Sequence, residues 1–255
     1  MSQIKSVEEI AAMREAGRVV AQALAAVKAH AEVGTALTEL DDVAATVFSG
    51  AGAVPAFLGY HPRWAPVPYP GVICASVNDA IVHGIANGLR LADGDVVSID
   101  AGAFLDGWCA DSAISFTVGT PRPEDVALIE ATEAALARGI AAARPGNTIG
   151  DISHAIGRDA RRAGYGILAG HGGHGIGRAM HEEPHVPNDG LPGRGIKLAE
   201  GLVIAIEPML ILGGRDEYTH DADGWTLRTP SGRRAAHAEH TVAVTAEGPL
   251  VLTLP

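Results

Sequence analysis

Apolar residues near the start of the chain recur at the spacing of an amphipathic helix, and further along they alternate as they do in strands. A capping box at residues 6–9 predicts the start of the first helix, which we expect to end near Gly34. The rest of the pattern predicts helices at 38–52, 124–143 and from 148 onward, and strands at 71–80, 93–119, 198–212 and from 238 onward. The order helix, helix, strands thus occurs twice. This order is typical of an α+β fold with a sheet covered by helices on one face.

Two stretches of the sequence repeat one another. LADGDVVSID ends at Asp100 and LAEGLVIAIE ends at Glu207, and both run Leu-Ala-acid-Gly, then a strand, then a carboxylate after Ile. Each copy is preceded by a histidine and followed by a second carboxylate, at His83 and His174 and at Asp111 and Glu239. The junctions GTAL at 34–37 and GNTI at 146–149 also match. Because no linker separates the halves, we expect one domain, residues 1–255, with two pseudo-symmetric halves.

The links between these elements have their own signals. Residues 55–70 are rich in proline and aromatic residues, and residues 170–185 are rich in glycine and histidine, so we expect both stretches to be loops. The pairs Asp106-Gly107 and Asp223-Gly224 predict β-hairpins.

The first of these hairpins fixes the geometry of two carboxylates. If Asp106-Gly107 is the turn, Asp111 lies opposite Gly102, and Asp100 is two residues from Gly102 on the same face. The two aspartates are then diagonal neighbours, roughly 7 Å apart at the backbone, within reach of a common ion. Two buried carboxylates this close would otherwise force one of them to hold a proton.

Four carboxylates at matching places in two repeats indicate a metal centre. Any one of them alone is more simply a surface charge, but the cluster needs cations, and a pair of ions about 3.5–4 Å apart meets that need. Oxygen donors with an imidazole suit Mn, Fe(II), Co or Zn rather than a thiolate-bound structural zinc. His174 and His181 in the glycine-rich stretch, and His83, would supply imidazoles. Seven further histidines are expected to be structural or exposed: His61, His154, His171, His185, His220, His237 and His240.

Composition narrows the class of protein. With 255 residues, 47% hydrophobic and a net charge of −11, the chain can bury a large core and is poorly suited to nucleic acid or an anionic membrane. We find no export signal and no apolar run long enough for a membrane span, and only Cys74 and Cys109 are cysteines, so the cytoplasm is expected. The absence of a G-x-S-x-G elbow and of a Walker A loop, with only three lysines, weakens serine-hydrolase, NTPase and Schiff-base chemistry. A G-x-G-x-x-G match at 170–175 is discounted because no clear helix follows it.

At this point the motifs VHGI, SIDAG, ADSA, GHGIGRAMHEEP, AIEPM, DGWTLRT and AEHTVAVT, in this order, resemble those of the bacterial type I methionine aminopeptidases. The resemblance covers residues 6–252 and implies the pita-bread fold, a curved antiparallel sheet covered by helices. It implies removal of the initiator methionine from nascent proteins and peptides when the second residue is small, by a monomer that uses two divalent ions (Co, Mn, Fe(II) or Zn). The partner is then the N-terminal Met of nascent polypeptides at the ribosome, and docking there would use the catalytic domain.

Motif by motif, the resemblance also implies roles for individual residues. The metal ligands would be Asp100, Asp111, His174, Glu207 and Glu239. Of these, Asp111 and Glu239 would bridge the ions and Glu207 would move the proton, while His83 and His181 would contact substrate and the tetrahedral intermediate. The ions would activate a hydroxide, and one would hold the free α-amine. The methionine pocket would be lined by Phe57, Tyr60, Tyr69, Cys74, Met180 and Trp225, whose aromatic and sulfur-bearing walls suit a thioether.

The chain departs from the family pattern in several places. The loop at 61–68 is longer than usual, Met180 stands where Phe is common, and Val82 stands where Cys is common. Ala235-Ala236-His237-Ala238 replaces Ser-Ala-Gln-aromatic, which bears on the pocket and on a monovalent-cation site near Asn78. Three other functions compete. An Xaa-Pro peptidase of the same fold is disfavoured because that group's large N-terminal domain is lacking, a non-catalytic peptide-binding relic because the ligands are intact, and metal storage because it leaves the carboxylate repeat unexplained.

Overall fold

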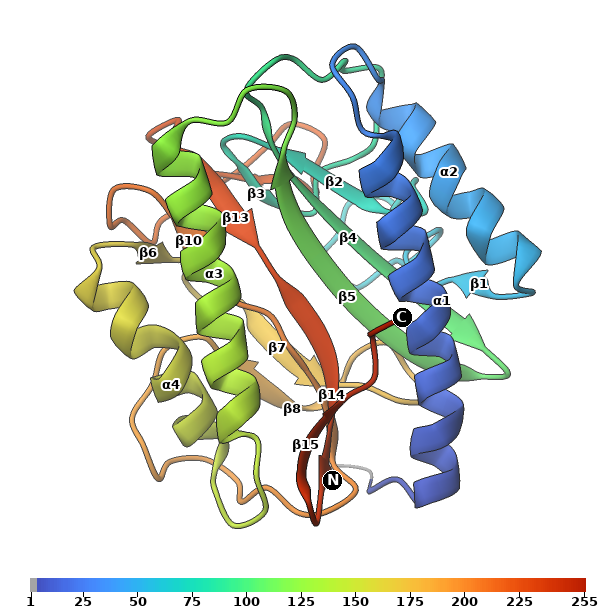
Figure 1. The fold of residues 1–255 in the computed structure, drawn as a ribbon, viewed down its shortest axis with the longest axis vertical. Coiled ribbons are helices and arrows are strands. Elements are labelled where there is room, and N and C mark those ends of the chain that lie inside the picture. Colours follow the sequence, from blue (N-terminus) through green and yellow to red (C-terminus); the bar gives the residue numbers. More distant parts are fainter. Residues whose placement is uncertain (1–3) are drawn as a thin grey trace.

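The computed structural model describes residues 4–255, in which four long helices cover one face of a large sheet (Figure 1). These helices are α1 (Val7–His30), α2 (Leu37–Gly50), α3 (Pro123–Ala142) and α4 (Ile149–Arg162). The predicted capping box of α1 is confirmed, and α4 begins with a similar arrangement. Ser6 Oγ accepts from the Glu9 amide at 3.3 Å at the start of α1, and the Asp151 carboxylate accepts from the Thr148 amide at 2.7 Å at the start of α4.

Within residues 4–255 the main sheet has nine strands, and the pairings between them are antiparallel. Its main path runs β1-β4-β5-β14-β9-β7-β8, with β2 paired to β4 and β15 paired to β14. The strands are β1 (Val54–Pro55), β2 (Cys74–Val77), β4 (Val96–Leu105), β5 (Trp108–Thr117), β7 (Gly172–Gly175), β8 (Glu182–Pro187), β9 (Val203–Ile206), β14 (Glu239–Thr245) and β15 (Gly248–Val251). Because β5 belongs to the first half and β14 to the second, their pairing joins both halves in one sheet.

Two three-stranded sheets complete the fold. The first has the order β13-β10-β6 and the second the order β11-β12-β3. Their strands are β3 (Ala80–Val82), β6 (Gly166–Ile167), β10 (Met209–Ile211), β11 (Thr219–His220), β12 (Leu227–Arg228) and β13 (Ala235–His237). Strands β11 and β12 form the hairpin predicted at Asp223-Gly224. Among the helices of residues 4–255, none has an apolar stretch long enough to cross a membrane.

The two halves repeat at the level of individual hydrogen bonds. The turn after α1 donates from Gly34 N to Leu91 O at 2.7 Å, and the turn after α3 donates from Gly146 N to Leu198 O at 3.1 Å. Gly34 has φ 94° and Gly146 has φ 89°, a region that glycine enters without strain. The matched junctions read from the sequence therefore adopt the same backbone, which confirms the internal repeat.

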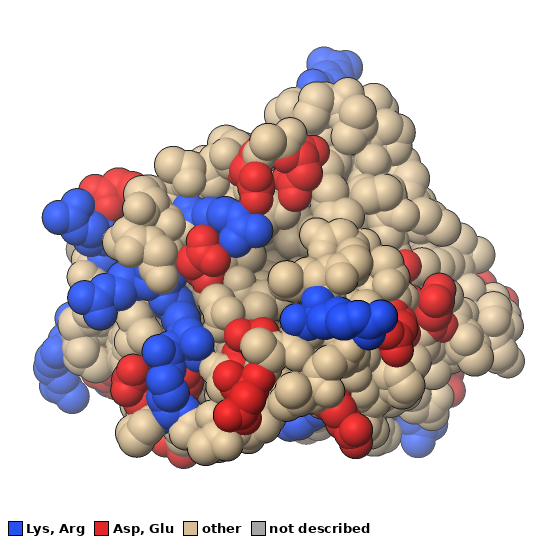
Figure 2. Space-filling model, turned by 90° about the horizontal axis from the view of Figure 1, so that it is seen from above, with Lys and Arg blue, Asp and Glu red and all other residues tan. Residues whose placement is uncertain are grey.

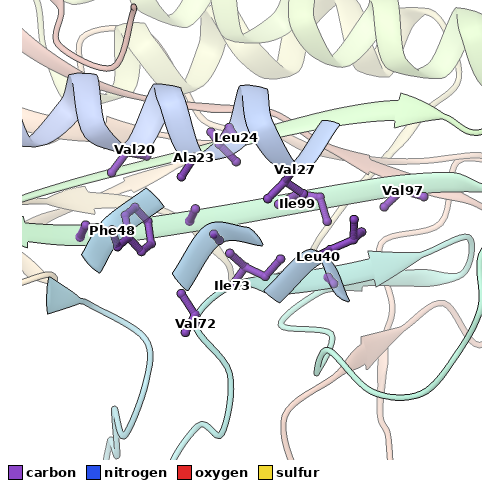
Figure 3. Close-up of a cluster of buried hydrophobic side chains, with 14 of the residues drawn as sticks. Val20, Ala23, Leu24, Val27, Leu40, Phe48, Val72, Ile73, Val97 and Ile99 are labelled. Atoms are coloured by element: carbon purple, nitrogen blue, oxygen red, sulfur yellow. The ribbon is translucent and has the colours of Figure 1, made fainter. Parts of the chain in front are cut away.

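Each half has its own apolar core. In the first, Val20 and Leu24 of α1 and Phe48 of α2 pack with Ile99 of β4 (Figure 3). In the second, residues of α3 and α4 pack against β9 and β14 around Ile156, which is fully buried. Two separate apolar clusters thus pack the helices against one face of the sheet, and the main packing does not depend on the other face.

On the face shown in Figure 2, lysine and arginine side chains lie beside acidic ones rather than in an uninterrupted basic patch. Arg161 illustrates the pattern, since it contacts Asp216 at 2.6 Å and Asp189 at 2.9 Å. With the net charge of −11, this surface offers little attraction to a polyanion.

The expectation that the whole stretch 170–185 is a loop is wrong at both ends, because β7 and part of β8 lie there. Glycines allow this close pairing: a Cβ at Gly173 would collide with the carbonyl of Ala205, and a Cβ at Gly172 with the carbonyl of Val186. Glycine has low strand propensity, which hides such strands in the sequence.

We predict that Gly17→Ala destabilises the protein although alanine is the better helix former. Gly17 lies in the middle of α1, where an added Cβ would overlap the backbone carbonyl of Leu252. Overpacking against backbone costs about 1–3 kcal/mol, which outweighs a helix-propensity gain of about 1 kcal/mol. The matched control is Gly50→Ala at the end of α2, where nothing lies within 4 Å of the added atom. Denaturant unfolding of both variants checks this, and equal free energies of unfolding would contradict it.

Candidate metal centre and active site

Three carboxylates share one face of three neighbouring strands. The predicted hairpin register is confirmed, with Gly102 opposite Asp111 on β4 and β5. Ala113 of β5 lies opposite Asp100 on one side and Glu239 of β14 on the other. Since Asp111 is two residues from Ala113, it points to the same side of the sheet. The pairing of β5 with β14 therefore brings a carboxylate of the second half to the pair in the first.

The second half adds a carboxylate and an imidazole. Glu207 directly follows β9, and its backbone carbonyl accepts from Asn188 Nδ2 at 2.8 Å. His174 lies on β7, with its Nε2 3.6 Å from Glu207 Oε1. The Gly175 carbonyl can only accept a hydrogen bond, so His174 Nδ1 carries the proton and donates to it at 2.9 Å. The lone pair of Nε2 is then directed to the carboxylates. This is the tautomer of a metal-binding histidine.

Ligand atoms from these residues converge in two groups. One atom each from Asp111, His174 and Glu239 lie within 4.8 Å of one another, and the same holds for Glu207, His237 and Glu239. Glu239 belongs to both groups, as a bridging ligand would. Asp100 belongs to neither group but lines the same cavity.

No lysine or arginine among residues 4–255 lines the cavity to offset the charge of these carboxylates when they are ionised. Burial, together with repulsion from Asp111, raises the pKa of Glu207 to about 8, and burial raises the pKa of Asp111 to about 6. Burial and the neighbouring carboxylates raise the pKa values of Asp100 and Glu239 well above the usual range. One oxygen each of Asp100, Asp111 and Glu239 is buried without a hydrogen-bond partner in this part of the chain. Such a donor set fits divalent cations.

All the residues predicted for the site line one cavity of about 420 Å³. The carboxylates and His174 line it together with the predicted methionine pocket, Phe57, Tyr60, Tyr69, Cys74, Met180 and Trp225. Tyr69 meets Phe57 edge to face at 6.3 Å between centroids and Trp225 at 5.0 Å. The lining of the cavity thus combines charged groups with an aromatic cluster.

Two further imidazoles, His83 and His181, line the cavity. His83 has φ 59°, a strained conformation for a residue with a side chain, and its Nδ1 is buried without a partner among residues 4–255. Burial, with nearby histidines, lowers its pKa to about 3, so it is neutral at physiological pH. His181 Nδ1 lies 3.1 Å from Tyr60 Oη, and its ring centroid lies 4.1 Å from that of His174. Burial also lowers the pKa of His181.

The loop at 61–68 contacts the pocket through Trp225. Its Val67 carbonyl accepts from Trp225 Nε1 at 3.0 Å, and Trp64 meets the Trp225 ring at 4.9 Å between centroids. Trp64 also stacks near His83 at 6.4 Å and lines the cavity, although 57% of it is exposed. Sequence reasoning missed Trp64, because its neighbours Trp225 and His83 are distant in sequence and only the fold brings them near.

Sequence reasoning also missed three histidines that we expected to be structural or exposed. His171 and His185 line the cavity, and His237 belongs to a candidate ligand group. For His237 a signal was available: it stands two residues before Glu239, the spacing that places side chains on one face of a strand. Near Asn78, the amide side chain is already bound to Asp95 Oδ1 and the Val96 amide, so a monovalent cation there stays a prediction.

Comparison with known proteins places these features in a family. Residues 11–246 match the model of metallopeptidase family M24. Methionine aminopeptidase 1 of Mycobacterium tuberculosis is 52% identical over 98% of this chain and 94% of its own. The crystal structure of methionine aminopeptidase from Thermotoga maritima superposes over 100% of both chains with a TM-score of 0.95 at 35% identity. The prolidase from Pyrococcus horikoshii matches 98% of this chain and 63% of its own, with a TM-score of 0.79, and at 24% identity shows the shared fold alone. The fold is the pita-bread fold of this family.

We predict that the metal-free protein loses thermal stability as the pH rises from about 7.5 to 8.5. In the folded protein Glu207 holds its proton up to about pH 8, whereas in the unfolded chain a glutamate ionises near about pH 4.3. The folded state therefore binds more protons in this window, and its advantage falls as the pH rises. The buried histidines do not oppose this, since histidine is neutral in both states above about pH 7.5.

Calorimetric Tm values of metal-stripped protein over this pH range check the prediction. Added divalent metal should flatten the slope by replacing the proton, and Glu207→Gln should flatten it without metal. A Tm of stripped protein that does not fall would contradict the prediction.

Proposed function

This chain belongs to metallopeptidase family M24, and from that premise we propose that it is a methionine aminopeptidase that removes the initiator methionine from nascent proteins and peptides when the second residue is small. One observation carries the proposal: a cluster of carboxylates and imidazoles shares a cavity of about 420 Å³ with aromatic and sulfur-bearing side chains. The cluster suits peptide hydrolysis, and the aromatic and sulfur-bearing lining suits the side chain of methionine.

The metal ligands we propose are Asp100, Asp111, His174, Glu207 and Glu239. When bound, two divalent ions supply Lewis acidity, which lowers the pKa of water and polarises the scissile carbonyl. The place of Glu239 in both candidate groups supports a bridging role, and Asp111 on the next strand is suited to the same role. Co, Mn, Fe(II) and Zn all accept such a donor set.

In this proposal Glu207 transfers the proton. Its carboxylate takes a proton from the attacking water and delivers it to the leaving amine.

The two neutral imidazoles, His181 and His83, contact the substrate. His181, with Nδ1 directed to Tyr60 Oη, can present Nε2–H to the oxyanion that forms at the carbonyl carbon. His83, with its strained backbone and its ring beside that of Trp64, lines the same cavity, where it can contact the peptide.

The methionine side chain would lie among Phe57, Tyr69, Met180 and Trp225, all of them buried. Sulfur–aromatic contacts of this kind contribute about 0.3–1.5 kcal/mol each. Tyr60 and Cys74 complete the pocket. The free α-amine beside the carboxylates explains why an unblocked N-terminus would be required.

We further infer a single catalytic domain over residues 1–255, supported by a main sheet that takes strands from both halves. The partner is the N-terminal Met of nascent polypeptides at the ribosome, with no role for nucleic acid or membrane, and the protein acts as a monomer in the cytoplasm. The unpaired, buried Cys74 and Cys109 are consistent with a reducing compartment.

Methionine release from a Met-Gly-Ser peptide by metal-stripped protein, with Mn, Co, Fe(II) or Zn added back, tests the proposal. We expect release only with metal, and no release from the N-acetylated peptide. Xaa-Pro peptides are assayed in parallel. Cleavage only before proline would contradict the proposal and indicate an Xaa-Pro peptidase. No cleavage by folded protein with any metal would make it a peptide-binding relic.

A further inference from the structure

His237 is a buried histidine beside the metal centre that none of the proposed steps uses. It ends β13, and only 2% of it is exposed. Its backbone is fixed on both sides by Ser115, whose Oγ accepts from His237 N at 3.0 Å and donates to His237 O at 2.7 Å. The side chain therefore projects from a rigid backbone position two residues before Glu239.

The imidazole is aimed between two carboxylates without bonding to either. His237 Nε2 is buried, lies 3.7 Å from Glu207 Oε2 and 3.8 Å from Glu239 Oε2, and has no hydrogen-bond partner in residues 4–255. These separations are too long for hydrogen bonds. They do suit ligands of one ion, because donors about 2.1 Å from a common metal stand roughly 3–4 Å apart.

We propose that His237 is a sixth metal ligand of this centre, which binds through Nε2 the ion shared by Glu207 and Glu239. The proposal rests on the metal-dependent function proposed above. It gives the two-ion centre two imidazoles, from His174 and His237, in place of one. An imidazole favours Zn, Co or Fe over the oxygen-preferring Mn and Mg, so His237 would shift this chain's metal preference in that direction.

The imidazole count at the metal tests the proposal directly. X-ray absorption of protein loaded with two equivalents of Co²⁺ should give two imidazoles per two ions in the unaltered protein. His237→Gln, which keeps a polar side chain of similar length, should give one. A count of one in the unaltered protein would overturn the proposal without the need for any variant.

Calorimetric titration of metal-stripped protein with Co²⁺ and with Mn²⁺ adds the energetic readout. His237→Gln should weaken one of the two Co²⁺ binding steps at least tenfold, and weaken Mn²⁺ binding less. The control is His154→Gln on α4, outside both candidate ligand groups, which should leave both steps unchanged. Weaker binding with an unchanged imidazole count would mean that His237 only orients the carboxylates, which overturns its role as a ligand.

The outcomes for this inference and for the proposed function are separable. Failure of the unaltered protein to bind Co²⁺ at all would remove the metal centre and the hydrolytic proposal with it. Normal binding and methionine release, with His237→Gln indistinguishable from the unaltered protein in count and affinity, would overturn the inference alone.

Discussion

Repulsion among buried carboxylates is the constraint on which the rest of this structure depends. Asp100, Asp111, Glu207 and Glu239 meet in one cavity that no lysine or arginine of residues 4–255 lines. Without cations the cluster must hold protons, because burial, the largest cause in each case, raises the pKa values of all four. Repulsion from neighbouring carboxylates raises those of Asp100, Glu207 and Glu239 further. Such a cluster lowers the stability of the fold, and clusters of this kind are typical of sites that bind a ligand. The same charge that destabilises the empty centre makes it a strong site for divalent metal.

The scaffold explains how one chain can assemble this site. Two similar halves each build an apolar core on the helix side of the sheet, so the opposite face does not have to supply the main packing. The pairing of β5 with β14 then sets Glu239 beside Asp111 with the accuracy of a hydrogen-bonded ladder. Glycine at positions such as Gly173 lets β7 approach β9 closely, which brings His174 to the same point. The loop at 61–68 contacts the aromatic lining of the cavity through Trp225.

Much of this could be predicted from the sequence, because the relevant signals are local. Asp106-Gly107 fixes a two-residue turn, the turn fixes the register, and the register places Asp100 and Asp111 on one face. The internal repeat then supplied the two glutamates. The strands at 172–187 could not be predicted, because their glycines are required by the close approach of other backbone segments, which only the fold shows. Trp64 was missed for a related reason, because only the tertiary fold brings its partner Trp225 near. His237 was missed although its spacing from Glu239 was visible in the sequence, because its second partner, Glu207, is distant along the chain.

The central claim is that this cluster is a two-metal centre, and anomalous diffraction from crystals grown with Mn²⁺ or Co²⁺ tests it most directly. The account predicts two anomalous peaks about 3.5–4 Å apart, both in contact with Glu239 and flanked by the remaining carboxylates. No peak within the cluster, in crystals of folded protein at saturating metal, would contradict it.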